Sequence, residues 1–297
     1  MAQPLHQKHR YWYIIKPFCP NKGKRLDLLN SVGMTSDSMT QPNMKQYTIK
    51  EEGGFRYHES GEGEVLLLLH GLFGALSNFQ YLINHFSASY KVSIPILPLF
   101  DLPKETTSVA GLLKHVEDFI EYKGYERVIL IGNSLGGHIA QLYALEHPLK
   151  TKALVLTASS GLFEESLGNT YPRKGDYEFI RERTAKTFYN PAMATKELVD
   201  EVFDIVNNRE KALSVLYIAK SAMRHNLREE VVNLKMPVLL IWGGADHITP
   251  PFVGEEYKQL IPQAELHILE NCGHAPMMEE PERFNELLAQ FLQHNKL

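Results

Sequence analysis

The chain lacks the features that would take it out of the class of ordinary globular proteins. Only two of its 297 residues are cysteines, Cys19 and Cys272, which excludes a disulfide framework and leads us to expect a reducing, cytoplasmic location. No apolar run approaches the roughly 18 residues that a membrane span needs. The formal net charge is −4, so nothing indicates nucleic acid or an anionic membrane as a partner.

Motifs that would indicate a metal or a nucleotide are missing as well. No H-E-x-x-H occurs, and His70, His138 and His274 are not spaced as metal ligands. No G-x-G-x-x-G follows a predicted strand, so a dinucleotide is not indicated. We therefore expect neither a metal nor a cofactor.

The beginning of the chain differs from the rest in charge. Residues 1–43 hold six lysines and arginines against two acids. Their apolar stretch, residues 11–15, is shorter than the roughly 7–15-residue core of a signal peptide. We expect residues 1–44 to be a disordered basic tail or an upstream extension before a true start at Met34 or Met44, with a targeting segment less favoured.

Strands and helices alternate along most of the remaining chain. Apolar runs predict strands at 65–69, 92–97, 128–131, 153–157, 238–242 and 265–269. Apolar residues at helical spacing predict helices at 78–86, 108–122, 135–146, 253–260 and 281–293. Together with a hairpin over 46–58, this alternation predicts an α/β fold with a mostly parallel, doubly wound sheet.

One internal region breaks the alternation. Between residues 161 and 234 no strong strand appears, and helices are predicted at 177–187, 195–207 and 210–223, with a short piece after Asn226. A helical block inserted in a parallel sheet is typical of a lid. We expect a core of residues 45–160 and 235–297, and a helical lid of residues 161–234.

The most informative motif is the G-N-S-L-G sequence at residues 132–136, between the strand at 128–131 and a helix. A serine hydroxyl is a weak nucleophile at pH 7, so a catalytic serine must be exposed, oriented and placed beside a base. A sharp strand-to-helix turn exposes and orients Ser134, and Gly132 and Gly136 let the chain pass closely on either side. The alternative is a tight-turn serine without chemistry.

Two candidate partners of Ser134 follow later strands, the acid first and the histidine second. Functional sites of open parallel sheets lie beyond the carboxyl ends of the strands. Asp246 follows the strand at 238–242 and can accept a hydrogen bond from a histidine ring. His274 follows the last strand and would take the Ser134 proton as general base. The alternatives are an aspartate that caps its own turn and a histidine, one of 13, with a structural role.

A glycine-containing turn, H-G-L-F-G at residues 70–74, follows the first buried strand. We expect the backbone N–H of Leu72, with Phe73 as second choice, to pair with that of Leu135 as an oxyanion hole. His70 is expected to support this turn and not to catalyse. An ordinary glycine turn is the alternative.

With these motifs the chain resembles the α/β-hydrolase superfamily over about residues 45–295. The resemblance rests on Leu69-His70-Gly71, Gly132-Asn133-Ser134-Leu135-Gly136-Gly137, Asp246 and Gly273-His274. It implies a triad of Ser134, His274 and Asp246, an acyl-enzyme intermediate and no cofactor.

The last third of the chain is also similar to the meta-cleavage-product hydrolases, which cut carbon–carbon bonds in dienoates. The similarity rests on Gly132-Asn133-Ser134, Trp242-Gly243, Cys272-Gly273-His274 and Glu280 with Phe284-Asn285. Two departures stand against it. That group carries tryptophan where this chain has Ala275, and its lid arginine has no counterpart in residues 195–203, although Arg173, Arg181, Arg183 or Arg209 could substitute.

Because of these departures, we expect a serine hydrolase that prefers an ester or thioester of a small molecule with an apolar part. The alternatives are carbon–carbon bond hydrolysis of the meta-cleavage type and a ligand-binding or sensing protein on a hydrolase scaffold. The sequence does not decide whether the chain forms a homodimer.

Overall fold

The computed structural model describes residues 47–74, 76–163 and 174–297, so the expected tail at residues 1–44 lies outside the described residues. The described part contains one eight-stranded sheet with the order β1-β2-β4-β3-β5-β6-β7-β8. Its strands are β1 (Lys50–Glu52), β2 (Phe55–Ser60), β3 (Val65–Leu69), β4 (Lys91–Pro95), β5 (Val128–Asn133), β6 (Thr151–Thr157), β7 (Val238–Gly243) and β8 (Glu265–Leu269).

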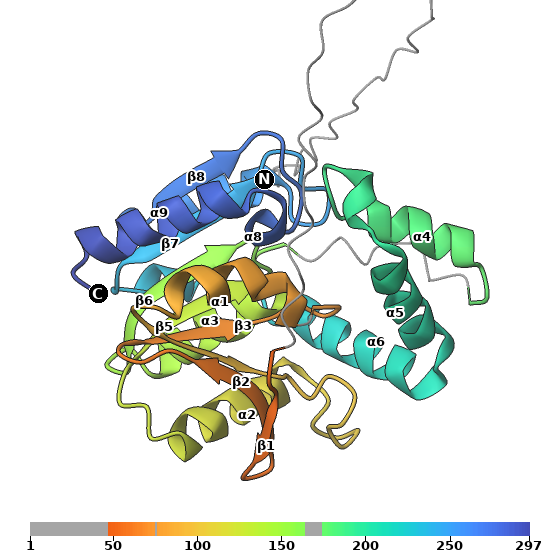
Figure 1. Ribbon diagram of the computed structural model, residues 1–297, viewed down its shortest axis with the longest axis horizontal. Helices are drawn as coiled ribbons and strands as arrows, with labels where there is room; N and C mark the ends of the chain where they lie inside the picture. The colour runs from red at the N-terminus through yellow and green to blue at the C-terminus, as the bar shows by residue number, and fades with distance from the viewer. Residues whose placement is uncertain (1–46, 75, 164–173) are drawn as a thin grey trace, which may run out of the picture. The chain divides into compact units, whose positions relative to one another are not determined.

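The sheet is mostly parallel. Strand β2 pairs antiparallel with β1 and with β4, and all other neighbouring strands pair in parallel. Parallel strands need crossover connections, which helices supply here (Figure 1). The predicted α/β class and doubly wound sheet are confirmed.

Helices cover both faces of the sheet. They are η1 (Leu76–Phe79), α1 (Gln80–Phe86), α2 (Val109–Tyr122), α3 (Leu135–Glu146), α7 (Pro251–Leu260), α8 (Pro276–Glu279) and α9 (Pro281–His294). Side chains of α2, α3 and α7 form one buried cluster, and side chains of α1, α8 and α9 form the other. In β5, Leu130 belongs to the first cluster, whereas Ile129 and Ile131 belong to the second. A strand buried on both faces needs such a continuous apolar run.

Among the residues that the structure describes, three further helices follow β6 and precede β7 along the chain, and we call them the inserted helices (Figure 1). They are α4 (Tyr177–Ala185), α5 (Lys196–Asn207) and α6 (Arg209–Arg224), and short 3₁₀ turns occur at η3 (Pro191–Met193) and η4 (Val231–Asn233). Asp176, Thr195 and Asn208 cap the three helices by accepting hydrogen bonds from backbone N–H groups. The role of a lid and the boundaries at residues 161 and 234 stay predictions.

The structure differs from the predicted elements in several places. Strand β4 ends at Pro95 and not at residue 97, and the 3₁₀ turn η3 was not predicted. The helix predicted at 78–86 is divided into the 3₁₀ turn η1 and the helix α1. Helix α8 was not predicted, because four residues are too few to show helical spacing of apolar side chains. It begins directly after the loop that carries His274.

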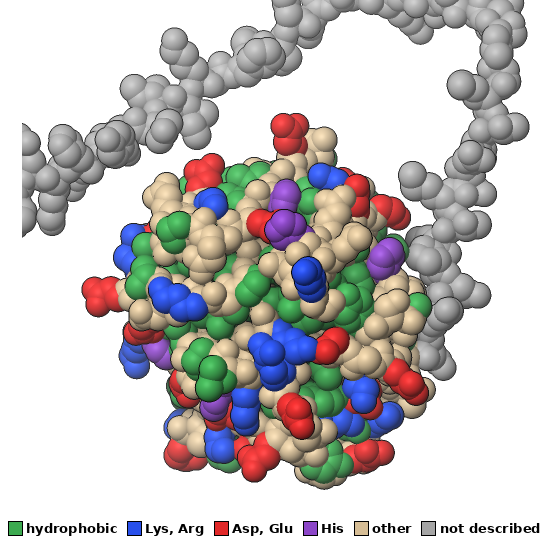
Figure 2. Space-filling model, turned by 90° about the vertical axis from the view of Figure 1, so that its left-hand side faces the viewer, with side chains coloured by type: hydrophobic (Ala, Val, Ile, Leu, Met, Phe, Trp, Pro, Cys, Tyr) green, Lys and Arg blue, Asp and Glu red, His purple; other side chains and the backbone are tan. Residues whose placement is uncertain are grey.

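The described surface carries charges of both signs. On the face shown in Figure 2, lysines and arginines lie among aspartates and glutamates, with hydrophobic side chains between them. Within the described ranges, no helix is both long and apolar enough to cross a membrane.

Candidate active site

Ser134 lies on the turn between β5 and α3, with φ 54° and ψ −121°. This left-handed conformation is costly for a residue with a side chain and persists only where the surroundings enforce it. The enforcing contacts are backbone hydrogen bonds: the Ser134 N–H donates to Thr157 O over 3.2 Å, and Ser134 O accepts from Ser160 N–H over 3.1 Å. The ends of β5 and β6 therefore hold the serine in its strained turn.

The glycines of the motif are required by close approach of the backbone. A Cβ on Gly132 would lie 2.5 Å from Gly136 O, and a Cβ on Gly136 would overlap Leu69 O. Both contacts are with backbone atoms, which cannot move aside by a rotamer change. The motif thus lets α3 begin directly against the ends of β5 and β3.

Asp246 and His274 come together beyond the ends of β7 and β8. His274 Nδ1 lies 2.9 Å from Asp246 Oδ2, and both side chains are buried. Asp246 Oδ1 also accepts from the N–H groups of Ile248 and Thr249, and Oδ2 accepts from the Thr249 hydroxyl. Asp246 therefore does both things that the sequence suggested as alternatives: it caps its own turn, and it binds the histidine ring.

The histidine loop is attached to the serine turn through Asn133. Its side-chain amide donates to His274 O over 3.2 Å and to Thr157 O over 3.1 Å. Across the described residues, no hydrogen bond joins the Ser134 hydroxyl to the His274 ring. Such bonds are commonly long until substrate binds. Because Nδ1 faces Asp246, the other ring nitrogen, Nε2, is left for the serine.

The turn after β3 packs directly against Ser134. A Cβ on Gly71 would lie 3.2 Å from Ser134 Cβ, and Gly74 N–H closes the turn on Gly71 O. The N–H groups of Leu72, Phe73 and Leu135 donate to no other residue that the structure describes. They can therefore receive an oxyanion, and this role stays a prediction.

His70 is a buried part of this turn. Its Nε2 accepts a hydrogen bond from Leu97 N–H over 3.0 Å, so Nδ1 carries the proton and donates to Gly71 O over 2.9 Å. Burial lowers the pKa of His70, which favours this neutral form. The ring supports the turn, in line with the prediction.

Sequence reasoning missed Glu279. Its carboxylate accepts hydrogen bonds from the N–H groups of Gly273 and Ala275, on either side of His274. A bond from a side chain to a distant backbone group leaves no spacing pattern. The available signal was an acid five residues after the candidate base.

Three of the four arginines proposed to replace the missing lid arginine are engaged elsewhere or not described, and the fourth, Arg209, is the first residue of α6. Arg181 pairs with Glu178 on its own helix, and the Arg183 guanidinium lies 5.3 Å from the centre of the Phe179 ring. Arg173 lies outside the described residues. Neither the Arg181–Glu178 pair nor the Arg183–Phe179 contact involves Ser134 or His274.

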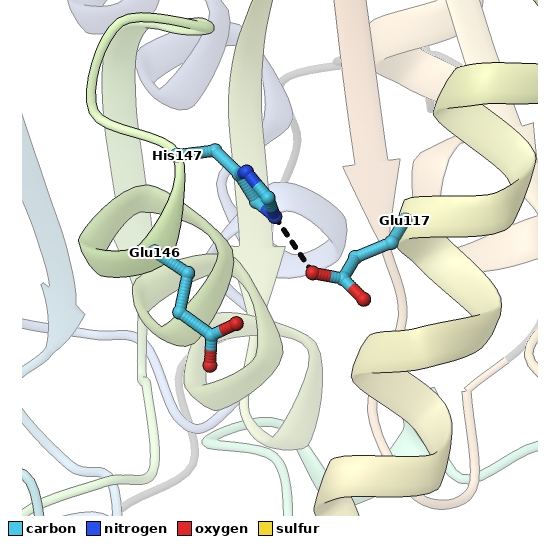
Figure 3. Close-up of side chains that lie close together, drawn as sticks. All are labelled: Glu117, Glu146 and His147. Carbon is cyan, nitrogen blue, oxygen red and sulfur yellow. Dashed lines mark hydrogen bonds and ion pairs between the residues drawn. The ribbon is translucent and has the colours of Figure 1, made fainter.

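A second group of titratable side chains lies at the other end of α3 (Figure 3). Ligand atoms of Glu117, Glu146 and His147 lie within 4.8 Å of one another, and His147 Nε2 is 2.6 Å from Glu117 Oε1. Ser134 and this group lie at opposite ends of the twelve-residue helix α3, which is roughly 18 Å long. We assign it a structural role, because the bond joins α2 to the end of α3.

Comparison with known proteins identifies relatives along most of the chain. A 2-hydroxy-6-oxononadienedioate/2-hydroxy-6-oxononatrienedioate hydrolase of Comamonas testosteroni is 29% identical, over 84% of this chain and 96% of its own. A 2-hydroxy-6-oxo-6-phenylhexa-2,4-dienoate hydrolase of Burkholderia cepacia is 28% identical with the same coverage. The crystal structure of MGS-MChE2, an alpha/beta hydrolase enzyme from the sediment metagenome of the Mar Chica lagoon, is 42% identical, with a TM-score of 0.70 over 84% of this chain and 100% of that one.

These relatives correct one expectation. The preference for an ester or thioester over a carbon–carbon bond is wrong, because the curated relatives are named as hydrolases of 2-hydroxy-6-oxo dienoates. The preference rested on Ala275 and on the arginine-free residues 195–203. Two local departures weigh less than similarity along most of the chain.

The family assignment follows from a separate match, to a family model. The model of the alpha/beta hydrolase family matches residues 66–287, from β3 to the middle of α9. This range includes the serine turn, Asp246 and His274. The chain belongs to the alpha/beta hydrolase family.

Proposed function

We propose that this chain hydrolyses a carbon–carbon bond in a 2-hydroxy-6-oxo dienoate, a product of meta-cleavage. The observation that supports the proposal is the buried Asp246–His274 pair, attached through Asn133 to a strained serine turn. The substrate class is supported by the names of the relatives, which match this chain over about 80–85% of its length.

The proposed reaction begins at the 6-oxo carbonyl carbon. His274 takes the hydroxyl proton as Ser134 Oγ bonds to this carbon, and the N–H groups of Leu72 and Leu135 stabilise the resulting oxyanion. Phe73 is the second choice for the donor of the first turn. Asp246 holds the His274 tautomer and stabilises the imidazolium.

Collapse of this intermediate breaks the bond between C5 and C6. For this electron pair to be conjugated, C5 must be saturated, so the 2-hydroxyl proton has moved to C5 before the attack and given the 2,6-diketo tautomer. The pair then spreads through the C3–C4 double bond to the 2-oxo oxygen, and His274 returns its proton to that oxygen. The acyl group left on Ser134 is removed by water, with His274 again acting as base. The products are a carboxylic acid and a hydroxydienoate, and one water is consumed.

Two assays on the purified chain test the proposal. The first follows consumption of a 2-hydroxy-6-oxo dienoate, and the second follows covalent labelling by a fluorophosphonate, located by mass spectrometry. We expect label on Ser134 and loss of both activities in Ser134→Ala and His274→Ala. His247→Ala is the matched control, because this exposed histidine lies beside Asp246 in the sequence and should leave both activities intact.

The outcomes separate the alternatives. Labelled Ser134 with untouched dienoate would reject the carbon–carbon bond as the substrate. Stoichiometric binding of the dienoate with neither labelling nor turnover would favour a binding protein on the same scaffold.

A further inference from the structure

The loop that carries His274 lies directly against the chain that follows α4. His274 N–H donates to Thr187 O over 2.8 Å. A Cβ on Gly273 would lie 2.7 Å from Thr187 O and 2.8 Å from Tyr189 N, so the two backbones are in close contact. The candidate base is thus attached to the segment that leads from α4 to η3.

Glu279 bridges the same two segments with its side chain. Its Oε1 accepts from the N–H groups of Gly273, at 2.9 Å, and Ala275, at 3.4 Å. Its Oε2 accepts from Tyr189 N–H at 2.7 Å. One oxygen therefore holds the residues on both sides of His274, and the other holds the segment after α4.

The bridge depends on the carboxylate as an acceptor. Burial raises the pKa of Glu279, whereas the hydrogen bonds from Tyr189, Gly273 and Ala275 N–H act in the opposite direction by favouring the ionised form. Hydrogen bonds from neutral N–H groups to a charged acceptor are stronger than neutral ones. A side chain with only one accepting oxygen cannot hold both segments.

We infer that Glu279 is a positioning residue that fixes the backbone on both sides of His274 against residues 187–189 and so sets where the His274 ring meets Ser134. The inference rests on the proposed roles of Ser134 and His274. It extends them by making the placement of the base depend on the segment between the inserted helices.

The test compares Glu279→Gln with the wild-type chain. The amide keeps the shape but has one accepting oxygen, so one end of the bridge is lost. We expect fluorophosphonate labelling of Ser134 and kcat for the dienoate to fall about tenfold, which corresponds to the loss of one hydrogen bond to a charged group. KM should change less than kcat, and the pH profile of labelling should shift, because the ring of the base is displaced.

Asp176→Ala is the matched control for simple loss of stability. Asp176 also accepts a backbone hydrogen bond, from Phe179 N–H, but at the start of α4 and away from the histidine loop. We expect it to lower the melting temperature and leave the labelling rate and its pH profile unchanged.

Either of two results would overturn the inference. The first is labelling of Ser134 in Glu279→Gln at the wild-type rate, and the second is an equal fall in the labelling rate in Glu279→Gln and in Asp176→Ala. Labelling that falls tenfold in a chain that never consumes the dienoate would support the role of Glu279 and reject the proposed substrate. A wild-type chain that is not labelled at all would reject both proposals.

Discussion

The side-chain amide of Asn133 donates a hydrogen bond to the backbone carbonyl of His274, a residue 141 positions later in the chain. The same amide donates to Thr157 O, so it joins the last residues of β5 and β6 to the loop after β8. The residue before the candidate nucleophile is thereby bonded to the candidate base itself. A single buried side chain therefore connects the two halves of the site directly.

Asn133→Asp tests this connection. The two side chains have the same shape, but a carboxylate has no donor and would face two carbonyl oxygens. We expect the free energy of unfolding to fall by roughly 3 kcal/mol, since burying unsatisfied polar groups costs about 1–3 kcal/mol each. Urea titration measures it. The exposed Asn233→Asp should change stability by less than about 0.5 kcal/mol, and equal effects of both variants would contradict the prediction.

Ser134→Gly should separate stability from chemistry. Glycine adopts φ 54° without the strain that a side chain suffers there. We expect no labelling by the fluorophosphonate and a gain of about 1 kcal/mol in the free energy of unfolding. Ser134→Ala keeps the strain, so it should lose labelling without gaining stability. Stability of Ser134→Gly at or below that of Ser134→Ala would show that the turn is not strained.

Gly136→Ala should be far more costly than Gly124→Ala. A Cβ on Gly136 overlaps Leu69 O, whereas a Cβ on Gly124 meets nothing within 4 Å and suffers only from φ +64°. We expect a loss of about 1–2 kcal/mol for Gly124→Ala from the left-handed backbone. The overlap with backbone should cost Gly136→Ala at least about 3 kcal/mol or prevent folding. Chemical unfolding of both variants measures the difference, and equal losses would contradict it.

His138 should make the chain less stable in acid. Burial, followed by the nearby His225, lowers the pKa of this fully buried ring to about 3. Between about pH 6.5 and pH 3 the unfolded chain therefore binds a proton that the folded chain rejects, and stability falls with pH by up to about 1.4 kcal/mol per unit.

Unfolding in urea at pH 6.5 and pH 5 measures this effect. We expect the loss between the two conditions to be smaller in His138→Gln by about 2 kcal/mol at most. The exposed His294→Gln should keep the wild-type dependence on pH. The same loss in His138→Gln and in the wild type would show that another group is responsible.

Local patterns in the sequence were sufficient for the layers of the fold and for the serine turn. The apolar runs of β3, β5 and β7 predict strands covered on both faces, because a strand with one wet face would alternate. Ser108 and the apolar spacing after it predict α2, and the structure places that serine as its N-cap. The G-N-S-L-G motif indicates the sharp turn, since its glycines are required by close contacts with each other's backbone and with the adjacent strand.

The sequence by itself thus determined the α/β class, the succession of most strands and helices along the chain, and the candidates Ser134, Asp246 and His274. Only the tertiary structure decided how these candidates are held. Asn133 meets His274 across 141 positions, and Glu279 meets Tyr189 across 90. A hydrogen bond from a side chain to a distant backbone group follows no regular spacing in the sequence. Any residue type can supply the backbone group, so the partner cannot be identified from the sequence. Helix α8, which carries Glu279, has a single turn, too short for a periodic pattern of apolar residues, so only the tertiary structure reveals it.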